Sequence, residues 1–332
     1  MRHLSVAEYG QFLGCTGDRL QVKHKDEVIL ETPLSRLRSI TIAKEGVGLS
    51  SNLLLACASR GIRLYVLDWR GIAVAALSGK HQHAIAAIRA AQFKCMNSPV
   101  AATLSAETVI TKLRNQRAVL LYFSKYLAKN NEHYLGELRQ SAAGLDELCR
   151  SVAAIQWQRR EQWRDQLMGY EGTGAAAYWK VLRTTELAPP SFEKRDGRGS
   201  KEIFNQALNY GYTLLMSYVW SALDNAGFEL YSGFFHQERA GKPSLVLDVM
   251  EEYRPWVVDR TIIAMRAVLA KEKSLDAKLK RRISNEIHAT MAKRYPYKGK
   301  RLRLESILQR QVYQLAGCVM DQKKYKGYRF KW

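Results

Sequence analysis

The segment FFHQERAGKPSLVLDVMEEYR, residues 234–254, combines a histidine with acids that lie inside or beside an apolar run. His236 precedes the run PSLVLDVM, Asp248 falls in the middle of it, and Glu251 and Glu252 follow directly. A buried carboxylate is costly unless it is paired, hydrogen-bonded or bound to a metal. The segment therefore predicts a specific partner for its acids.

A helix that begins at Pro243 and Ser244 would place Asp248 and Glu251 on one face, because residues three apart on a helix are neighbours. An imidazole nitrogen together with carboxylate oxygens suits Mn²⁺ or Mg²⁺ better than a thiolate site would. From these residues alone, two interpretations stay open. One is a divalent-metal site, and the other is a histidine hydrogen-bonded to acids within the core.

Another candidate acid stands in the stretch GYEGTGAAAYW, residues 169–179, where Glu171 lies among glycines and alanines. Small residues allow a close approach of one backbone to another, so this helix could pack tightly while Glu171 projects into a cleft. The alternative is an acid near a helix N-terminus, where the helix dipole favours negative charge.

The chain carries far more basic than acidic residues. Of its 332 residues, 52 are Lys or Arg and 31 are Asp or Glu, which gives a formal net charge of +21 at pH 7. Binding to phosphates releases counterions, so this surplus predicts a nucleic-acid partner, with a merely basic surface as the alternative. The basic runs fit phosphate contacts that position a duplex without reading its bases. One run holds Lys278, Lys280, Arg281 and Arg282, and two others cover residues 293–303 and 323–331.

The cysteines and the apolar segments exclude several classes of protein. The five cysteines are widely spaced and form no CxxC pair, so zinc fingers and redox motifs have no support. Their odd number fits buried thiols in a reducing cytoplasm. No apolar stretch approaches the roughly 20 residues needed to cross a bilayer, and the N-terminus has no signal-peptide pattern. We expect a cytoplasmic protein that has no membrane partner.

Hydrophobic periodicity predicts an α+β fold with a small β-rich domain, residues 1–82, followed by a large all-α domain, residues 83–332, that carries the chemistry. The expected strands are RLQVKH, EVILET, SITIAK, IRLYVLD and IAVAAL. Between them, Ser50 or Ser51 caps a helix that Gly61 ends. Apolar residues then recur at helical spacing, and the two domains join near residues 78–85.

Four stretches occur in one order along the chain: GYEGTGAAAYW, NQALNYGYTLLMSYVWSALDNAGFE, GFFHQERAGKPSLVLDVMEEYRPWVVDR and LESILQRQVYQLAGCVM. In this order they resemble the CRISPR-associated adaptation integrases of the Cas1 family, over nearly the whole chain. The segments IRAAQF and KLRNQ are similar to early helices of that family. The glutamate among glycines, the histidine and the LDxMEEYRP element are specific as a set, although none of them is specific alone.

The resemblance implies the residues of the site. It assigns the ligands of Mn²⁺ or Mg²⁺ to Glu171, His236 and Glu251. Asp248 matches a further acidic position that either binds the ion or supports a ligand. Glu252 is the alternative to Glu251.

The resemblance also implies the reaction and the partners. The 3′-hydroxyl of a short captured DNA is joined to a CRISPR repeat by metal-dependent transesterification. The implied partners are double-stranded DNA, a second copy paired through the N-terminal domains, and the small Cas2 protein. The arm FEKRDGRGSKEIFNQ lacks the double proline often found in the family, so whether Arg195 and Arg198 contact DNA stays open.

Two other functions remain as alternatives. A metal-dependent nuclease or transposase-like enzyme would use the same site for hydrolysis, and a non-catalytic scaffold would only bind DNA. The sequence has no phosphate-cradling GxxxxGK[ST] loop and no apparent Ser-His-Asp arrangement, so neither ATP nor a covalent nucleophile is implied.

Overall fold

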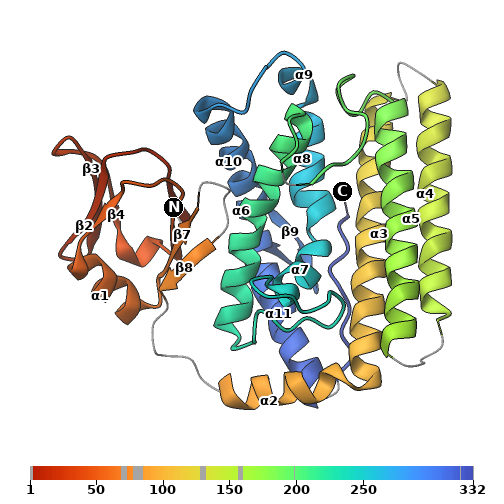
Figure 1. The fold of residues 1–332 in the computed structure, drawn as a ribbon, viewed down its shortest axis with the longest axis horizontal. Helices are drawn as coiled ribbons and strands as arrows, with labels where there is room; N and C mark the ends of the chain where they lie inside the picture. Colours follow the sequence, from red (N-terminus) through yellow and green to blue (C-terminus); the bar gives the residue numbers. More distant parts are fainter. Residues whose placement is uncertain are drawn as a thin grey trace. The chain divides into compact units, whose positions relative to one another are not determined.

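The computed structural model describes residues 3–68, 73–77, 85–127, 132–155, 160–197, 199–321 and 323–331. The chain forms two compact units, Met1–His83 and Ala84–Trp332, each with its own hydrophobic core. Of the expected junction near residues 78–85, residues 78–84 lie outside the described part. Figure 1 shows a strand-rich first unit and a mostly helical second unit, so the predicted fold class is confirmed.

The first unit contains two four-stranded sheets, of order β1-β5-β7-β8 and β4-β3-β2-β6. In the first sheet β1, β5 and β7 are parallel, and in the second β2, β3 and β4 are antiparallel. The strands are β1 (His3–Val6), β2 (Gln11–Thr16), β3 (Arg19–His24), β4 (Glu27–Pro33), β5 (Ser39–Ile42), β6 (Gly48–Leu49), β7 (Arg63–Leu67) and β8 (Ala73–Leu77).

Helix α1 (Ser51–Arg60) of this unit begins and ends where the sequence predicts. The side chain of Ser50 caps it by accepting a hydrogen bond from the backbone N–H of Leu53. Gly61 ends it with φ 65°, a left-handed conformation that glycine adopts without steric cost. Strands β1, β2 and β6 were not predicted from the sequence. Strands β1 and β6 are short and pair in parallel with β5 and β2, whereas β2 pairs with the following strand β3 across the turn at Gly17 and Asp18.

The second unit is built mainly from helices. The helices α3, α4 and α5 pack against one another as a layer, while α6, α7 and the π-helical turn η2 contact one another beside α3 (Figure 1). The elements are α2 (Ile85–Met96), α3 (Pro99–Leu127), α4 (Glu132–Ala153), α5 (Arg160–Thr184), α6 (Ile203–Asn225), α7 (Ser244–Glu251), η2 (Arg254–Asp259), α8 (Arg260–Ala264), α9 (Arg266–Leu269), α10 (Ala277–Ala292) and α11 (Leu304–Asp321).

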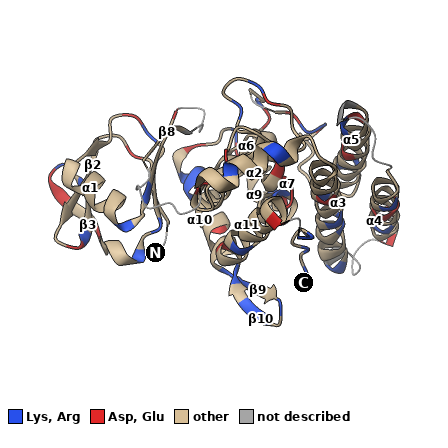
Figure 2. Ribbon diagram, turned by 90° about the horizontal axis from the view of Figure 1, so that it is seen from below, with Lys and Arg blue, Asp and Glu red and all other residues tan. Residues whose placement is uncertain are grey.

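One detail of the second unit differs from the expected all-α domain. Strands β9 (Arg294–Tyr297) and β10 (Lys300–Arg303) form an antiparallel hairpin between α10 and α11. Lys298 and Gly299 both have positive φ, 46° and 78°, as a two-residue hairpin turn of the favoured type requires. The second basic run therefore lies on this hairpin, whose Lys and Arg residues are coloured in Figure 2.

The cysteines and helix lengths agree with the composition of the chain. The structure describes all five cysteines, and each is a free thiol. Burial raises the pKa of the Cys57 thiol to about 11, so this thiol is an unreactive core residue near neutral pH. In the ranges that the structure describes, no helix combines the length and the apolar character needed to cross a bilayer.

Candidate active site between helices α3, α5 and α7

Three helices bring charged side chains to one place. Helix α5 carries Glu171, α7 ends with Glu251, and the neighbouring helix α3 carries Lys112. Helix α5 packs closely on α3 at Gly174, where an added Cβ would clash with the Leu113 side chain. Gly174, one helical turn after Glu171, thus allows the close approach of the two helices, whereas nothing lies within 4 Å of a Cβ added at Gly169 or Gly172.

Lys112 joins the two glutamates. Its ammonium Nζ forms an ion pair with Glu171 Oε1 and lies 2.6 Å from Glu251 Oε2. The Lys112 side chain is 10% exposed, the Glu171 side chain 23% and the Glu251 side chain 3%. Glu251 is therefore a buried acid, and Glu171 gives the pair its opening to solvent.

The other oxygen of Glu251 has a second cation as its partner. Arg254 NH1 lies 2.5 Å from Glu251 Oε1, and the Arg254 guanidinium stands 5.0 Å from the centroid of the Tyr212 ring. Arg195 approaches the same ring at 5.3 Å. The Tyr212 hydroxyl in turn donates a 2.5 Å hydrogen bond to Asp259 Oδ1. Arg254 is thus held by a carboxylate and by an aromatic ring.

These charges set the protonation of the site. Burial alone would raise the pKa of Glu251, but the charges of Arg254, Lys112 and His236 lower it below its ordinary value. Burial would lower the pKa of Lys112, but the carboxylates of Glu251 and Glu171 raise it above its ordinary value. At neutral pH an ionised Glu251 therefore faces a protonated Lys112.

Asp248 holds the turn that presents His236. Its Oδ2 accepts hydrogen bonds from the backbone N–H of Phe234 (2.7 Å) and Phe235 (3.0 Å). Its Oδ1 accepts from the backbone N–H of His236 (2.9 Å) and lies 2.7 Å from the ring nitrogen Nδ1 of the same residue. Both oxygens of this buried carboxylate are therefore occupied within the protein. The ring nitrogen Nε2 of His236 is left as the one that could bind a ligand.

The segment before His236 is irregular, and it forms no strand in residues 228–237, all of which are described. The fully buried Gln92 of α2 fastens it through three hydrogen bonds to the backbone of Glu229 and Ser232. At Gly233, an added Cβ would lie 2.7 Å from Asp248 Oδ2. The turn thus requires a glycine where the backbone meets the acid.

Glu252 points away from this group. Its Oε1 accepts a 2.7 Å hydrogen bond from the Tyr325 hydroxyl, and its Oε2 accepts from the backbone N–H of Tyr328. Burial raises the pKa of Glu252 to about 8. This acid therefore fastens the C-terminal segment 323–331, and it does not face Lys112.

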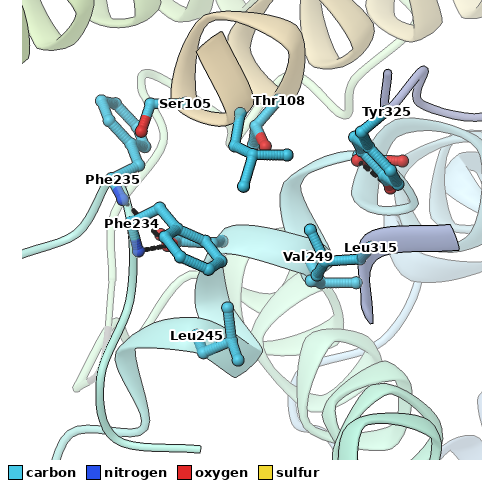
Figure 3. A pocket seen from close by; sticks show the side chains of 11 residues that line it. Ser105, Thr108, Phe234, Phe235, Leu245, Val249, Leu315 and Tyr325 are labelled. Carbon is cyan, nitrogen blue, oxygen red and sulfur yellow. Dashed lines mark hydrogen bonds between the residues drawn. The ribbon is translucent and has the colours of Figure 1, made fainter. Parts of the chain in front are cut away.

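A small cavity lies on the side of α7 that faces α3, α11 and the C-terminal segment. Its lining includes Ser105, Thr108, Leu245, Val249 and Tyr325 (Figure 3). It has room for about one water molecule. This cavity is too small for a substrate. The candidate site is instead the charged group on α3, α5 and α7, which is partly exposed at Glu171.

The side chains present fit a hard divalent cation by their chemistry, although they do not form a coordination sphere. Carboxylate oxygens and an imidazole nitrogen are ligands that Mn²⁺ and Mg²⁺ accept. Glu251 Oε2 is buried and makes no hydrogen bond, since its approach to Lys112 is an ion pair without hydrogen-bond geometry. Among the described residues, no three His, Cys, Asp or Glu side chains are grouped closely enough to hold an ion. The ammonium of Lys112 stands between two of them.

The candidate DNA-binding residues have different surroundings. Lys278, Lys280, Arg281 and Arg282 are all exposed on α10. Arg195 is instead engaged within the protein, since its guanidinium donates hydrogen bonds to the side-chain oxygens of Asn205 (2.9 Å) and Asn209 (2.6 Å). Arg198 lies outside the described residues.

Two residues of the site were not singled out in the sequence. Lys112 lies within KLRNQ, between the buried residues Thr111 and Leu113. A lysine in an apolar helix face is a signal, because a buried ammonium requires an acidic partner. Arg254 stands three residues after Glu251, the spacing of a helical ion pair.

The sequence is similar to a known protein family and to individual proteins with known names. The family model described as CRISPR associated protein Cas1 matches residues 4–290. The CRISPR-associated endonuclease Cas1 1 of Francisella tularensis subsp. novicida is 44% identical over 332 residues, 100% of both chains. The protein of the same name from Archaeoglobus fulgidus is 24% identical and aligns over 99% of both chains.

Solved structures share the fold. A casposase bound to an integration product has a TM-score of 0.78 at 21% identity, covering 100% of this chain and 95% of that chain. A Cas6-RT-Cas1–Cas2 complex has a TM-score of 0.78 at 23% identity, and the match covers 99% of this chain and 36% of that chain. A Cas1 protein from Thermotoga maritima has a TM-score of 0.74 at 16% identity, and the match covers 99% of this chain and 100% of that chain. At these identities the likeness concerns the fold.

Proposed function

The chain belongs to the Cas1 family of CRISPR-associated proteins, and from this premise we propose that it is a spacer-integrating enzyme. The proposed reaction is a transesterification in which the 3′-hydroxyl of a short captured DNA attacks a phosphodiester at the edge of a CRISPR repeat. Two similarities support this proposal: relatives are named CRISPR-associated endonucleases, and the casposase that shares the fold is bound to an integration product.

One observation carries the proposal. Glu171 and Glu251, 80 positions apart in the numbering, meet at one ammonium, Lys112 Nζ. A point that already attracts a cation between two carboxylates is where a divalent ion would be bound. We propose Glu171, Glu251 and His236 as the ligands, with His236 binding through Nε2. Mn²⁺ or Mg²⁺ would supply Lewis acidity that polarises the phosphoryl group and lowers the pKa of the attacking hydroxyl.

Asp248 has a different part in the proposed mechanism. Its two oxygens accept three backbone hydrogen bonds and contact His236 Nδ1, so it orients the imidazole and aims Nε2 toward the site. A histidine ligand is commonly fixed in this way by a carboxylate on its other nitrogen. We therefore assign Asp248 as a positioning residue and not as a ligand.

The proposed partners are double-stranded DNA, a second copy of the chain and a Cas2 protein, in the cytoplasm. The exposed cations of α10 and the β9–β10 hairpin supply phosphate contacts. For pairing through the N-terminal domain, the support is exposed apolar surface: Val28 and Ile29 on the edge strand β4 are 48% and 52% exposed, and Leu55 on α1 is 69% exposed. The Cas1–Cas2 complex that shares the fold supports the third partner.

The test is a strand-joining assay. The protein and its Cas2 partner are incubated with Mn²⁺, a short duplex and a plasmid that carries the repeat, and joined products are followed on a gel. A duplex that ends in 2′,3′-dideoxynucleotides is the matched control, because it lacks the attacking hydroxyl. Joined products that require the 3′-hydroxyl are expected.

Two other results would contradict the integrase proposal. Cleavage of the plasmid without joining, equal with both duplexes, indicates a hydrolytic nuclease. DNA binding without any product, unchanged by EDTA and by the substitution Glu171→Gln, indicates a non-catalytic scaffold.

A further inference from the structure

Lys112 occupies the position between the proposed metal ligands. Its ammonium contacts Glu171 from α5 and Glu251 from α7, and its side chain is only 10% exposed. Helix α3 packs directly against α5 and contacts α7, and this packing places Lys112 between Glu171 and Glu251. It is therefore part of the built site and not a surface side chain that rests on it.

Both oxygens of Glu251 already have cationic partners, Lys112 at Oε2 and Arg254 at Oε1. A divalent ion that binds Glu251 through either oxygen must therefore displace one of these cations. Binding without displacement would place the ion within a few ångströms of an ammonium in a buried site, where repulsion between like charges is strong.

Of the two cations, Lys112 is the one free to leave. Arg254 is held on a second side by the Tyr212 ring, at 5.0 Å, so displacing it would also break a cation–π contact. In the described part of the chain, the Lys112 ammonium is held by the two carboxylates alone, at the end of a flexible four-carbon stem. Glu171, 23% exposed, gives an incoming ion access on the same side.

We propose that Lys112 is an exchangeable internal counter-ion, which neutralises the Glu171–Glu251 pair in the metal-free protein and leaves when the divalent cation binds. The proposal rests on the metal site proposed above. The exchange is favourable because two carboxylates carry two negative charges, of which one ammonium balances one and a divalent ion balances both. It also lowers the apparent metal affinity, because the ion competes with a cation tethered at its own site.

The test measures metal binding and not activity. The metal-free protein is titrated with Mn²⁺, and free Mn²⁺ is counted by electron paramagnetic resonance. Lys112→Met removes the charge but keeps the length and helix preference of the side chain. We expect Mn²⁺ to bind about tenfold more tightly to this variant than to the parent. Lys112→Arg, which keeps the charge, and Lys125→Met, which removes a charge from an exposed position on α3, should bind like the parent.

The direction of the change separates exchange from a structural role. A lysine that merely supports the site would leave metal affinity unchanged or weaken it on replacement, so either result for Lys112→Met overturns the exchange. If the parent binds Mn²⁺ and Lys112→Met gains nothing, the metal site stands and the exchange fails. If neither binds Mn²⁺, the proposed metal site itself fails, and the exchange with it.

A second measurement uses the parent protein, in case Lys112→Met does not fold. Lysines are acetylated briefly with and without Mn²⁺, and modification at each position is read by mass spectrometry. Exchange releases the Lys112 amine, so Mn²⁺ should increase its acetylation severalfold relative to Lys125. Equal acetylation, or protection of Lys112 by Mn²⁺, overturns the proposal.

Discussion

His236 and Asp248 work as one unit at the scale of single residues. Both carboxylate oxygens of Asp248 accept hydrogen bonds from the backbone of the turn Phe234–His236, and one of them also contacts the ring of His236. The orientation of the imidazole therefore depends on an acid 12 positions further along the chain. Glu251, on the same short helix, meets different partners. The two acids of LDVME thus differ: Asp248 contacts the His236 turn, and Glu251 contacts Lys112 and Arg254.

We predict that His236→Ala abolishes strand joining and leaves DNA affinity nearly intact. The site loses one imidazole ligand, whereas DNA affinity is spread over many Lys and Arg residues. Joining should fall by at least about 100-fold, because the Lewis acid would be lost or misplaced. Joining is measured on a gel, and binding is measured by fluorescence anisotropy of labelled DNA.

Folding is the confounding effect, because His236 also contacts Asp248. The thermal transition of His236→Ala is therefore compared with that of the parent in EDTA. A folded His236→Ala protein that joins strands near the parent rate would overturn the assignment of His236 as a ligand.

Glu252 yields a prediction on stability against pH. Burial raises its pKa in the folded protein from 4.5 to about 8, so the folded state keeps a proton that the unfolded state has released. Between pH 4.5 and about 8 the unfolded state binds fewer protons at this group, and its contribution to stability falls as pH rises. Glu252→Gln has no group that ionises here, so its stability does not fall in this way. The variant should therefore become more stable relative to the parent as the pH rises from 4.5 to about 8.

The measurement is urea denaturation in EDTA at pH 5 and pH 8.5. The difference in unfolding free energy between Glu252→Gln and the parent should be larger at pH 8.5 than at pH 5, by about 1 kcal/mol or more. An equal difference at both pH values would show that Glu252 ionises normally in the folded protein.

At the scale of elements, the approach of α5 to α3 sets the place of Glu171. At Gly174, one turn after Glu171, an added Cβ would clash with Leu113, and it would lie 3.4 Å from Leu148 and 3.5 Å from Leu145. Leu113 is fully buried, so it has little room to move aside. The glycine is thus a requirement of packing, which the neighbouring small residues do not share to the same degree.

We predict that Gly174→Ala lowers the free energy of unfolding by about 1–3 kcal/mol through overpacking. It should also reduce strand joining, because α5 carries Glu171 away from Lys112 and Glu251. Gly169→Ala is the matched control on the same helix, since nothing lies within 4 Å of its added Cβ. That variant should gain up to about 1 kcal/mol from helix preference.

Denaturant unfolding and the joining assay check both variants. A Gly174→Ala protein as stable as Gly169→Ala would show that α3 and α5 separate without cost. The close approach would then not be what places Glu171.

At the scale of the whole molecule, the net charge of +21 predicts strong electrostatic binding to DNA. We expect the logarithm of the affinity to fall linearly with the logarithm of the salt concentration, with a slope that corresponds to several phosphates. Affinity should also depend little on DNA sequence, because phosphate contacts carry no base information. Fluorescence anisotropy with two unrelated duplexes at several salt concentrations measures both quantities.

The basic face of α10 is tested by replacing Lys278, Lys280, Arg281 and Arg282 together with alanine. All four are exposed, so the fold should be retained. If all four contact phosphates, the salt slope falls by about four units, at 0.9 for each phosphate contact. Mn²⁺ affinity should be unchanged, because α10 carries no proposed ligand. An unchanged salt slope would place the DNA on another basic surface, such as the β9–β10 hairpin.

The sequence by itself determined the features that depend on nearby residues. The alternation of apolar residues indicated strands β3, β4, β5, β7 and β8, helical spacing indicated the helices, and Ser50 with Gly61 marked the ends of α1. The pattern also placed the start of α7 at Pro243 and Ser244. Strands β1, β2 and β6 and the β9–β10 hairpin were not predicted, because strand formation depends on pairing with partner strands and carries a weak local signal.

The tertiary structure decided which partner each charge meets. A helical pattern places Asp248 and Glu251 on one face, but only packing sends the first to the His236 turn and the second to Lys112 on α3. It also turns Glu252 toward Tyr325. Lys112 and Glu171 lie 59 positions apart, and no local rule connects them. The reason is physical: periodicity depends on the backbone geometry of one element, whereas an ion pair between helices depends on how separate elements bury their apolar faces against each other.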